Sequence, residues 1–330
     1  MPELYRIFGS ELSPYSVKVR SYARYKGIAH DWIVRNPAVE AEFQRHAKLP
    51  LVPLVVTPTG RGWQDSTPIV EQLEQLYAEP SIHPAEPGPA FLSALIEEYG
   101  DEWVNKSMFH YRWTYEPDQQ STAARLARSL NPDLSGDLGQ AIAAVKARMI
   151  PRLKLVGSSA ATKDHLEGSY RRLLAILEAH LNGRMYLFGA RPAFADFSLF
   201  AQLHQLSTDP TPGAIMRAEA PHVARWIQAM LSPRAEGPFE PWAALAPTLL
   251  PLLREEIGGL FLPWSAANAR AVAEGAAELT VALGGRPFVQ EPQRYAAKSF
   301  GVLRARYTAV ADRSGLDPIL CETGCWSWLQ

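Results

Sequence analysis

Cysteine is nearly absent from this sequence, which has only Cys321 and Cys325, both close to its end. Two cysteines cannot build the dense disulfide framework that small secreted domains use, so the cytoplasm is the expected compartment. The pair Cys-Glu-Thr-Gly-Cys has no third or fourth metal ligand nearby, so we expect free thiols and no metal site.

The sequence also lacks an excess of charge of either sign. It has 33 Lys+Arg against 34 Asp+Glu, a formal net charge of −1, which gives no electrostatic basis for binding nucleic acid or an anionic membrane. No apolar run approaches the roughly 20 residues of a membrane span. The first residues do not show the basic-then-apolar pattern of a signal peptide.

What the sequence does contain is enough material for two domains and an appended third segment. It has 330 residues, of which 47% are hydrophobic and 20% charged, an ordinary globular balance. The first eighty residues alternate between apolar runs and amphipathic segments, which predicts a small α/β unit of the order strand-helix-strand followed by strand-strand-helix. The predicted elements are 4–8, 13–26, 30–34, 51–56, 63–64 and 69–77.

Residues 13–20, Ser-Pro-Tyr-Ser-Val-Lys-Val-Arg, follow the first predicted strand and begin the first helix. Ser13 is a good N-cap and Pro14 suits the first helical position. A helix start offers unpaired N–H groups and a positive dipole end, which stabilise a thiolate. Because no cysteine lies nearby, a thiolate held there would come from a ligand. Simple helix capping is the alternative reading of this stretch.

Two further motifs follow in the same unit. Val52-Pro53 places a proline inside an apolar strand, where it removes a hydrogen-bond donor. Asp65-Ser66 begins the next helix, where a hydroxyl and free N–H groups can donate to a carboxylate and Asp65 suits an ammonium group. Each motif also has a purely structural reading, as an edge-strand device and a helix cap respectively.

Together, in this order and spacing, residues 13–20, Val52-Pro53 and Asp65-Ser66 resemble the thioredoxin-like N-terminal domain of glutathione transferases. The resemblance implies a cis Val52–Pro53 bond, with the backbone of Val52 meeting the cysteinyl amide of glutathione. It implies that Asp65 and Ser66 hold the γ-glutamyl end. It also implies that Ser13 activates the thiol, as the corresponding serine does in the zeta, theta and delta classes.

The sequence departs from the family pattern shortly before the proline pair. Where many members place Lys, Arg or Gln to meet the glycine carboxylate of glutathione, this sequence has Pro50 and Leu51. Lys48 is the nearest cation, and we take it as the substitute. Tyr15 is expected to form part of the pocket wall.

The rest of the chain predicts an all-helical domain. Its first long helix, 91–114, carries Trp103, Lys106, His110 and Trp113 at roughly helical spacing. In the family this helix faces the cleft, so His110 and Trp113 are candidates for binding an apolar second substrate. The alternative is an aromatic stripe that packs as core. Residues 117–136 are expected to be rich in loops.

The segment 188–197 resembles the buried core segment of the family's helical domain. Asp196 stands where the family has its capping-box aspartate, and Ala193 stands where the family has a capping Ser or Thr. Loss of that cap costs about 1 kcal/mol of stability and leaves function untouched. After residue 240 the sequence continues with two helices and, around Gly284-Gly285, a predicted β-hairpin over 279–289.

The sequence therefore predicts an α/β thioredoxin-like domain over 1–78, a linker over 79–89, an all-α domain over 90–240 and a C-terminal extension over 241–330. The resemblance implies a glutathione S-transferase that uses glutathione as co-substrate to attack a small electrophile, and a homodimer. Two alternatives stay open: a non-catalytic binding or scaffold protein with the same fold, and a glutathione-dependent cis–trans isomerase.

Overall fold

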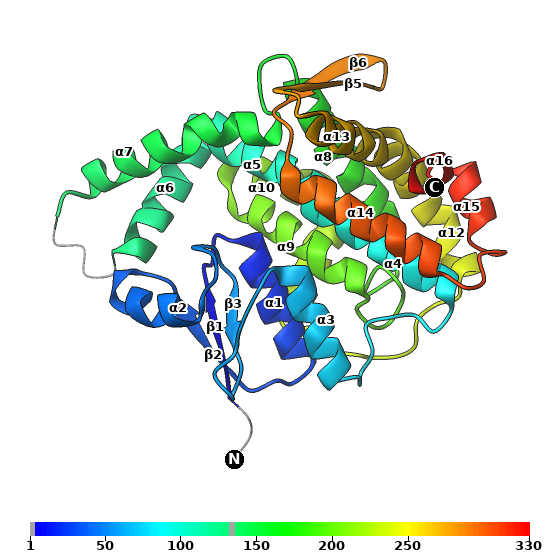
Figure 1. The fold of residues 1–330 in the computed structure, drawn as a ribbon, viewed down its shortest axis with the longest axis horizontal. Coiled ribbons are helices and arrows are strands. Elements are labelled where there is room, and N and C mark those ends of the chain that lie inside the picture. The colour runs from blue at the N-terminus through cyan, green and yellow to red at the C-terminus, as the bar shows by residue number, and fades with distance from the viewer. Residues whose placement is uncertain (1–3, 132–135) are drawn as a thin grey trace.

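A four-stranded mixed sheet forms the N-terminal part of the protein (Figure 1). The computed structural model describes residues 4–131 and 136–330. The strand order is β2-β1-β3-β4, in which β1 pairs with β2 in parallel and with β3 antiparallel, and β3 pairs antiparallel with β4. The strands are β1 (Tyr5–Gly9), β2 (His30–Val34), β3 (Leu54–Val56) and β4 (Gly62–Gln64).

Helices cover both faces of this sheet. Helix α1 (Pro14–Tyr25) and helix α3 (Ser66–Leu76) lie on the face toward the helical domain, and α2 (Glu40–His46) lies on the other (Figure 1). Alternate residues of the strands point to opposite faces, so one apolar cluster forms beneath α2 and another beneath α1 and α3. This is the thioredoxin-like arrangement that the sequence predicts.

The second part of the chain is helical, also as predicted. Its centre is α9, whose residues are almost all buried against α1, α4 and the helices around them. Its helices are α4 (Pro87–Tyr99), α5 (Asn105–Thr114), α6 (Glu116–Leu130), α7 (Leu138–Met149), α8 (Lys163–His180), α9 (Phe194–Thr208), α10 (Pro210–Glu219) and α11 (Pro221–Met230), with a 3-10 segment η3 (Ile150–Val156).

Residues 117–136 are not the loop-rich stretch that the sequence predicts. Most of them belong to α6, and residues 132–135 lie outside the described part of the chain. Pro117 occupies the first turn of α6, where its missing N–H costs nothing.

One turn of π-helix, η2 (Gly100–Val104), joins α4 and α5 into a long continuous helix. Gly100 is required there, because a Cβ at this position would lie 2.3 Å from Ser198 Oγ on α9. A π-turn inserts an extra residue and so changes which side chains face a given direction, a feature that recurs at functional sites. Here it sets the orientation of Asp101 and Glu102.

A buried ion cluster joins the two parts of the protein. Lys18 on α1 donates to Asp101 Oδ2 at 2.6 Å and also pairs with Glu97 on α4. Ser198 Oγ donates to Asp101 Oδ1 at 2.8 Å, and Thr67 Oγ1 donates to Glu97 Oε1 at 2.6 Å. Burial opposes the charge on Lys18, but the two carboxylates raise its pKa above the ordinary value, so the lysine stays charged.

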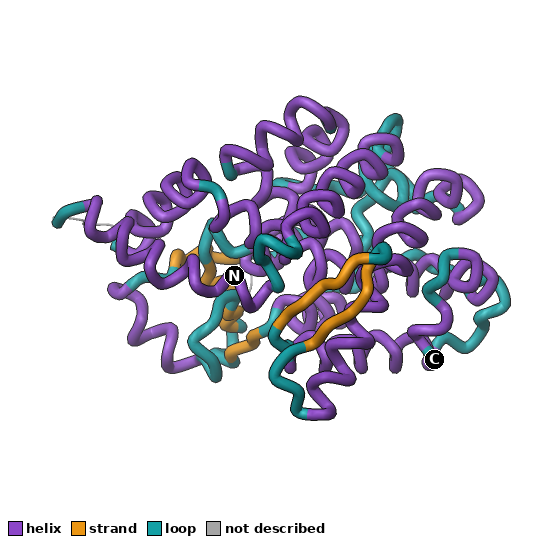
Figure 2. Tube along the Cα trace, turned by 90° about the horizontal axis from the view of Figure 1, so that it is seen from above, coloured by secondary structure: helices purple, strands orange, loops and turns teal. Residues whose placement is uncertain are grey.

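The C-terminal extension packs over the helical domain and reaches back to the N-terminal one. Helix α14 crosses in front of α4 (Figure 1), and the β5-β6 hairpin lies at the surface (Figures 1 and 2). Gly284 and Gly285, both at positive φ, form the turn of this hairpin. The elements are α12 (Trp242–Pro251), π-helix η4 (Leu252–Phe261), α13 (Leu262–Glu274), β5 (Leu279–Leu283), β6 (Arg286–Gln290), α14 (Arg294–Ala309), α15 (Asp317–Glu322) and α16 (Trp326–Leu329).

Both cysteines of the extension are free thiols, Cys321 exposed and Cys325 buried. Within 4–131 and 136–330, none of the helices has the length and apolar character needed to cross a bilayer.

Candidate active site

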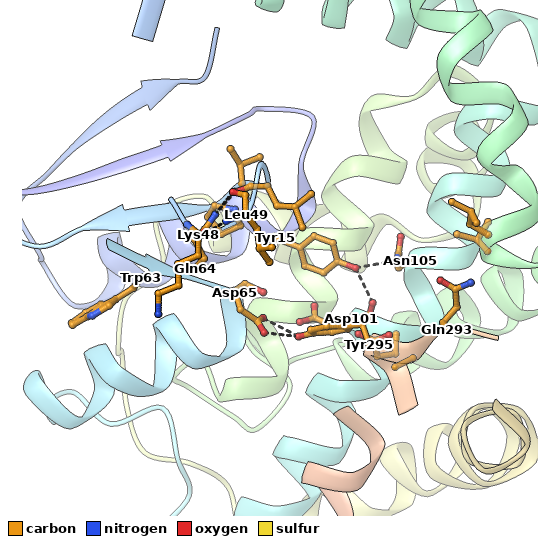
Figure 3. Close-up of a pocket in the computed structure, with 18 of the residues that line it drawn as sticks. Tyr15, Lys48, Leu49, Trp63, Gln64, Asp65, Asp101, Asn105, Gln293 and Tyr295 are labelled. Carbon is orange, nitrogen blue, oxygen red and sulfur yellow. Dashed lines mark hydrogen bonds between the residues drawn. The ribbon is translucent and has the colours of Figure 1, made fainter. Parts of the chain in front are cut away.

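A cavity of about 670 Å³ lies where the N-terminal sheet, the α4-α5 helix and the extension meet (Figure 3). The N-terminal domain contributes the residues before β3 and those at the start of α3. Helix α5 and the π-turn form the opposite wall, and α13 and α14 of the extension close the third side. The residues that line it include Tyr15, Lys48, Leu51, Val52, Pro53, Arg61, Asp65, Ser66, Asp101, Glu102, Asn105, Lys106, Trp264, Gln293 and Tyr295.

Val52 and Pro53 lie on the edge of this cavity, directly before β3, and the bond between them is cis, as the resemblance predicts. The loop before them is held by Gln64, which the sequence analysis missed. Its Oε1 accepts from the N–H groups of Lys48 and Leu49 at 2.7 and 2.9 Å, and its Nε2 donates to the carbonyls of Leu49 and Leu51 at 2.8 Å. Gln64 therefore fixes the backbone shape of one cavity wall.

Asp65 and Ser66 lie at the start of α3 and face the cavity. Ser66 is buried, and Asp65 is the only described non-glycine residue with a positive φ, +78°. This conformation turns the Asp65 carboxylate away from capping α3 and toward the cavity. There its oxygens accept from the hydroxyl of Tyr295 on α14 at 2.8 and 2.9 Å (Figure 3). Burial raises the pKa of the Asp65 carboxyl.

Ser13 caps α1, as the sequence predicts, with its Oγ accepting from the N–H of Ser16 at 3.3 Å. Its hydroxyl proton has no acceptor among the described residues and stays available for a ligand. Ser13 is partly exposed and does not itself line the cavity, whereas Tyr15 does. The Tyr15 hydroxyl donates to the carbonyl of Asp101 at 3.1 Å and accepts from Asn105 Nδ2 at 2.9 Å. Burial raises the pKa of Tyr15 well above its usual range, so the phenol stays neutral.

Two cations stand at the mouth of the cavity. Lys48 lines it with an exposed side chain, and Arg61, on the turn before β4, lines it as well. Sequence reasoning found Lys48 but missed Arg61, because nothing in the spacing of the motifs indicates which side of the turn faces the pocket. The two residues that depart from the family pattern differ in placement: Leu51 lines the cavity, and the carbonyl of Pro50 accepts from Arg35 at 2.8 Å.

The structure places His110 and Trp113 outside the cavity. His110 is buried, with Nδ1 2.7 Å from Ser158 Oγ and Nε2 3.1 Å from Glu167 Oε1. Trp113 is buried in a separate apolar cluster with helices α6 and α7. Both lie farther along α5, where η3, α6 and α8 pack over the helix. Their part of the helix is therefore core, and neither His110 nor Trp113 lines the described cavity.

The α4-α5 helix instead presents Glu102, Asn105 and Lys106 to the cavity. Burial raises the pKa of Glu102 to about 8 and lowers the pKa of Lys106 to about 7. Glu102 and Lys106 are four positions apart, so the sequence alone indicates that they share one helix face. Lys106 also belongs to the stripe of Trp103, Lys106, His110 and Trp113 described above. Trp264, Gln293 and Tyr295 come from the extension, for which the sequence offers no pattern that indicates a site.

Comparison with known proteins gives matches to two family models, one in each half of the chain. Residues 7–81 match the family model described as "Glutathione S-transferase, N-terminal domain", and residues 160–229 match the one described as "Glutathione S-transferase, C-terminal domain". No curated protein matches this chain.

Solved structures are similar to it at low sequence identity. A glutathione S-transferase from Methylobacterium radiotolerans, in complex with glutathione sulfonate, is 20% identical with a TM-score of 0.45, covering 74% of this chain and 94% of the other. The β-etherase LigF from Sphingobium sp. strain SYK-6 is 19% identical with a TM-score of 0.48, covering 76% and 99%. The Tau class enzyme from mango is 16% identical with a TM-score of 0.46, covering 68% and 87%.

Proposed function

We propose that this chain, which belongs to the glutathione S-transferase family, binds glutathione at the edge of the described cavity and activates its thiol for attack on a small electrophile. The observation that carries the proposal is that Val52, Asp65-Ser66 and Tyr15, from three separate motifs, line one cavity of about 670 Å³, while Ser13 lies two residues before Tyr15 at the start of α1. That volume lies in the range of small-molecule sites. A purely structural role for each motif would not require them to meet.

In this proposal the glutathione backbone lies along Val52, which precedes β3 at the rim of the cavity. A peptide that lies beside a strand end can pair with backbone N–H and C=O groups. The γ-glutamyl carboxylate meets Ser66 and the free N–H groups of α3, where a helix N-terminus favours an anion. The γ-glutamyl ammonium meets Asp65. The glycine carboxylate lies at the mouth, between Lys48 and Arg61.

The sulfur then points to the start of α1, where Ser13 donates its free hydroxyl proton. A free thiol titrates near ~8.5, and each unit by which its pKa falls corresponds to about 1.4 kcal/mol of preference for the thiolate. One hydrogen bond to a charged acceptor contributes roughly 1.5–3 kcal/mol, which is enough to lower the pKa by one to two units. Glutathione is the nucleophile, so the proposed reaction needs no metal.

The electrophile occupies the inner part of the cavity. Tyr15 forms one wall, Trp264 and the start of α14 form another, and Glu102, Asn105 and Lys106 lie on the helix between them. We further propose that the protein acts in the cytoplasm as a homodimer, the common state of symmetric oligomers.

The test is direct. Isothermal titration with glutathione is expected to show binding at micromolar to millimolar concentration, and the protein is expected to conjugate glutathione to a benzyl halide. Absence of heat at millimolar glutathione, with the protein folded by circular dichroism, would overturn the proposal.

One observation favours a second candidate, a binding protein of this fold that has lost catalysis. The hydroxyl of Tyr295 already donates a hydrogen bond to the carboxylate of Asp65, which is the proposed partner of the γ-glutamyl ammonium. The two candidates differ in outcome, because a non-catalytic protein would bind glutathione weakly or not at all and would release no halide from the benzyl substrate.

A further inference from the structure

A second, smaller cavity of about 110 Å³ lies between the start of α3, helix α4 and helix α14 of the extension. It adjoins the larger cavity, because Asp65 and Tyr295 line both. A space of this size has room for several water molecules or for an organic ligand of about four to six non-hydrogen atoms.

Acidic side chains outnumber basic ones around this small cavity. The charged side chains that line it are the acids Asp65, Glu71, Glu97 and Glu98 and the cations Lys298 and Arg306. Glu71 pairs with Arg306. Glu97 pairs with Lys18, and Asp65 is bonded to the α14 hydroxyl described above. Three of the four acids are therefore already engaged.

Glu98, on α4, is the fourth acid. Its residue is only 8% exposed, and its Oε1 accepts no hydrogen bond from any described residue. Lys298 lines the cavity from α14 with an exposed side chain, but it makes no ion pair with Glu98 in the described structure. A buried carboxylate oxygen without a donor is costly, so its environment calls for a bound group.

The surroundings of Glu98 favour a positively charged group. Burial raises the pKa of Glu98 well above its usual range. The carboxyls of Glu102, Glu97 and Asp101, on the same continuous helix, raise it further, and the hydroxyl of Ser299 on α14 acts in the opposite direction. From α3 and α14, Glu98 faces the charged side chains listed above. A cation that enters the cavity would displace the proton of Glu98 and pair with the carboxylate.

We infer that this small cavity is a binding site for a small primary ammonium ion, with the Glu98 carboxylate as its counter-ion. A primary ammonium has three N–H donors, and the hydroxyl oxygens of Thr67 and Ser299 line the cavity as further acceptors. Val302 and Leu303 line it as well and suit a short alkyl chain. Ca²⁺ or Mg²⁺ would need several free oxygen ligands, whereas one of the four lining acids is free. This inference does not rest on the proposed function.

The test is isothermal titration of the full-length protein with n-propylammonium chloride, without glutathione. The wild type is expected to bind the amine. Glu98→Gln loses a hydrogen bond to a charged group and is expected to bind it about 10- to 150-fold more weakly. The control is Glu116→Gln, an exposed acid on α6 outside the cavity, which is expected to keep the wild-type affinity. Circular dichroism verifies that each variant is folded.

The pH dependence provides a readout that a purely structural role of Glu98 would not move. The alkylammonium stays charged below about pH 9, because its amine resembles that of lysine. The association constant of the wild type is therefore expected to rise with pH, by about tenfold per unit while Glu98 is protonated in the free protein. In Glu98→Gln this rise is expected to be lost. Titration in two buffers of different ionisation enthalpy measures the released proton.

A variant at the surface tests the site without touching its buried acid. Lys298→Met removes the exposed cation that lines the cavity and is expected to tighten amine binding about 2- to 5-fold. Binding by Lys298→Met with none by the wild type would show that the lysine of the chain is itself the cation, and would overturn the inference.

Two further cations define the ligand class. Tetrapropylammonium is too large for the cavity and has no N–H donor, so it is expected not to compete with n-propylammonium. Displacement of the amine by an equal concentration of KCl, but not of NaCl, would assign the site to a metal cation and overturn the inference. Absence of heat with the wild type and with Lys298→Met, or equal affinities of the wild type and Glu98→Gln, would also overturn it.

The shared wall links this site to the proposed glutathione site. A positive charge beside Asp65 offsets the carboxylate that is proposed to meet the γ-glutamyl ammonium, so bound amine is expected to weaken glutathione binding, and glutathione to weaken amine binding by the same factor. This consequence, unlike the site itself, rests on the proposed function. A protein that binds the amine but not glutathione would retain the ammonium site and overturn the transferase proposal.

Discussion

The hydroxyl of Tyr295 lies 2.8 and 2.9 Å from the two carboxylate oxygens of Asp65, although 230 residues separate them in the chain. Tyr295 is in the first turn of α14, in the extension, and Asp65 precedes α3, in the N-terminal domain. The extension is therefore part of the cavity and engages the acid that the proposed function assigns to glutathione.

Removal of this hydroxyl is expected to tighten glutathione binding. In the wild type, the γ-glutamyl ammonium must displace the Tyr295 hydroxyl from the Asp65 carboxylate. In Tyr295→Phe the ring still packs on the cavity wall, but there is no hydroxyl to displace. A hydrogen bond to a charged group contributes roughly 1.5–3 kcal/mol, and because Tyr295 is half-exposed the lower limit applies, so Kd is expected to fall about 10-fold. Isothermal titration measures the change.

The matched control for this variant is Tyr307→Phe. Tyr307 is on the same helix, and its hydroxyl donates to Asp317 Oδ1 at 2.8 Å, away from the cavity. This control is expected to leave the glutathione affinity at the wild-type value. Weaker binding by Tyr295→Phe than by the control would mean that the hydroxyl supports the ligand, contrary to the prediction.

Replacement of Ser13 is expected to slow conjugation. Loss of a hydrogen bond to the thiolate, roughly 1.5–3 kcal/mol, lowers kcat/KM for a benzyl halide about 10- to 150-fold and raises the apparent pKa of the bound thiol by one to two units. Steady-state rates measured from pH 6 to 9 give both kcat/KM and the apparent pKa of the bound thiol. Ser13→Ala also loses the cap of α1, at about 1 kcal/mol of stability.

The control for Ser13→Ala is Ser10→Ala in the same loop, since Ser10 Oγ accepts from the N–H of Leu12 at 3.2 Å and has no other partner among the described residues. It is expected to keep the wild-type rate. Wild-type turnover by Ser13→Ala would remove Ser13 from the mechanism and direct attention to the neutral phenol of Tyr15.

Loss of Lys18 is expected to destabilise the fold severely. Lys18→Met leaves Glu97 and Asp101 buried side by side with no cation, and breaking a buried pair on one side costs about 3–5 kcal/mol. Urea unfolding of Lys18→Met is compared with that of Lys163→Met, which loses only a half-exposed ion pair that contributes little to stability. The triple variant Lys18→Met/Glu97→Gln/Asp101→Asn is expected to recover much of the loss. A stability equal to that of Lys163→Met would contradict the interpretation.

The buried His180 is expected to make stability depend on pH. Burial lowers its pKa from 6.5 to about 4, and its ring contacts Thr248 Oγ1 at 2.7 Å and the carbonyl of Leu187 at 2.8 Å. The unfolded chain therefore takes up this proton first as the pH falls. The stabilisation is fully present above pH 6.5 and is lost between about pH 6.5 and 4, a total of about 3 kcal/mol.

His180→Gln removes the titrating group and keeps a donor for Leu187. Urea unfolding at pH 7.5 and at pH 4.5 is expected to show a smaller difference for this variant than for the wild type. An equal difference in the two proteins would show that other groups carry the acid sensitivity.

Much of the N-terminal domain was predictable because its signals are local. Ser13 and Pro14 define the start of α1, and the alternating apolar residues around β1 and β3 define the sheet. Residues close together in the chain are therefore sufficient to predict these elements. The placement of His110 and Trp113 was not predictable in this way. Helical spacing shows that they share a face with Lys106, but it does not show where along the helix the cavity ends and packing by η3, α6 and α8 begins.

The sequence by itself determined the α/β unit, the helical character of the rest and the three motifs that resemble glutathione transferases, because capping, strand alternation and turns depend on residues close together in the chain. Only the tertiary structure decided that Tyr295 meets Asp65, that Lys106 lies between Gln290 and Trp264, and that the extension closes the cavity. These contacts join residues more than 150 positions apart, and burial, which shifts the pKa of Glu102 and Lys106, is a property of the packed chain as a whole.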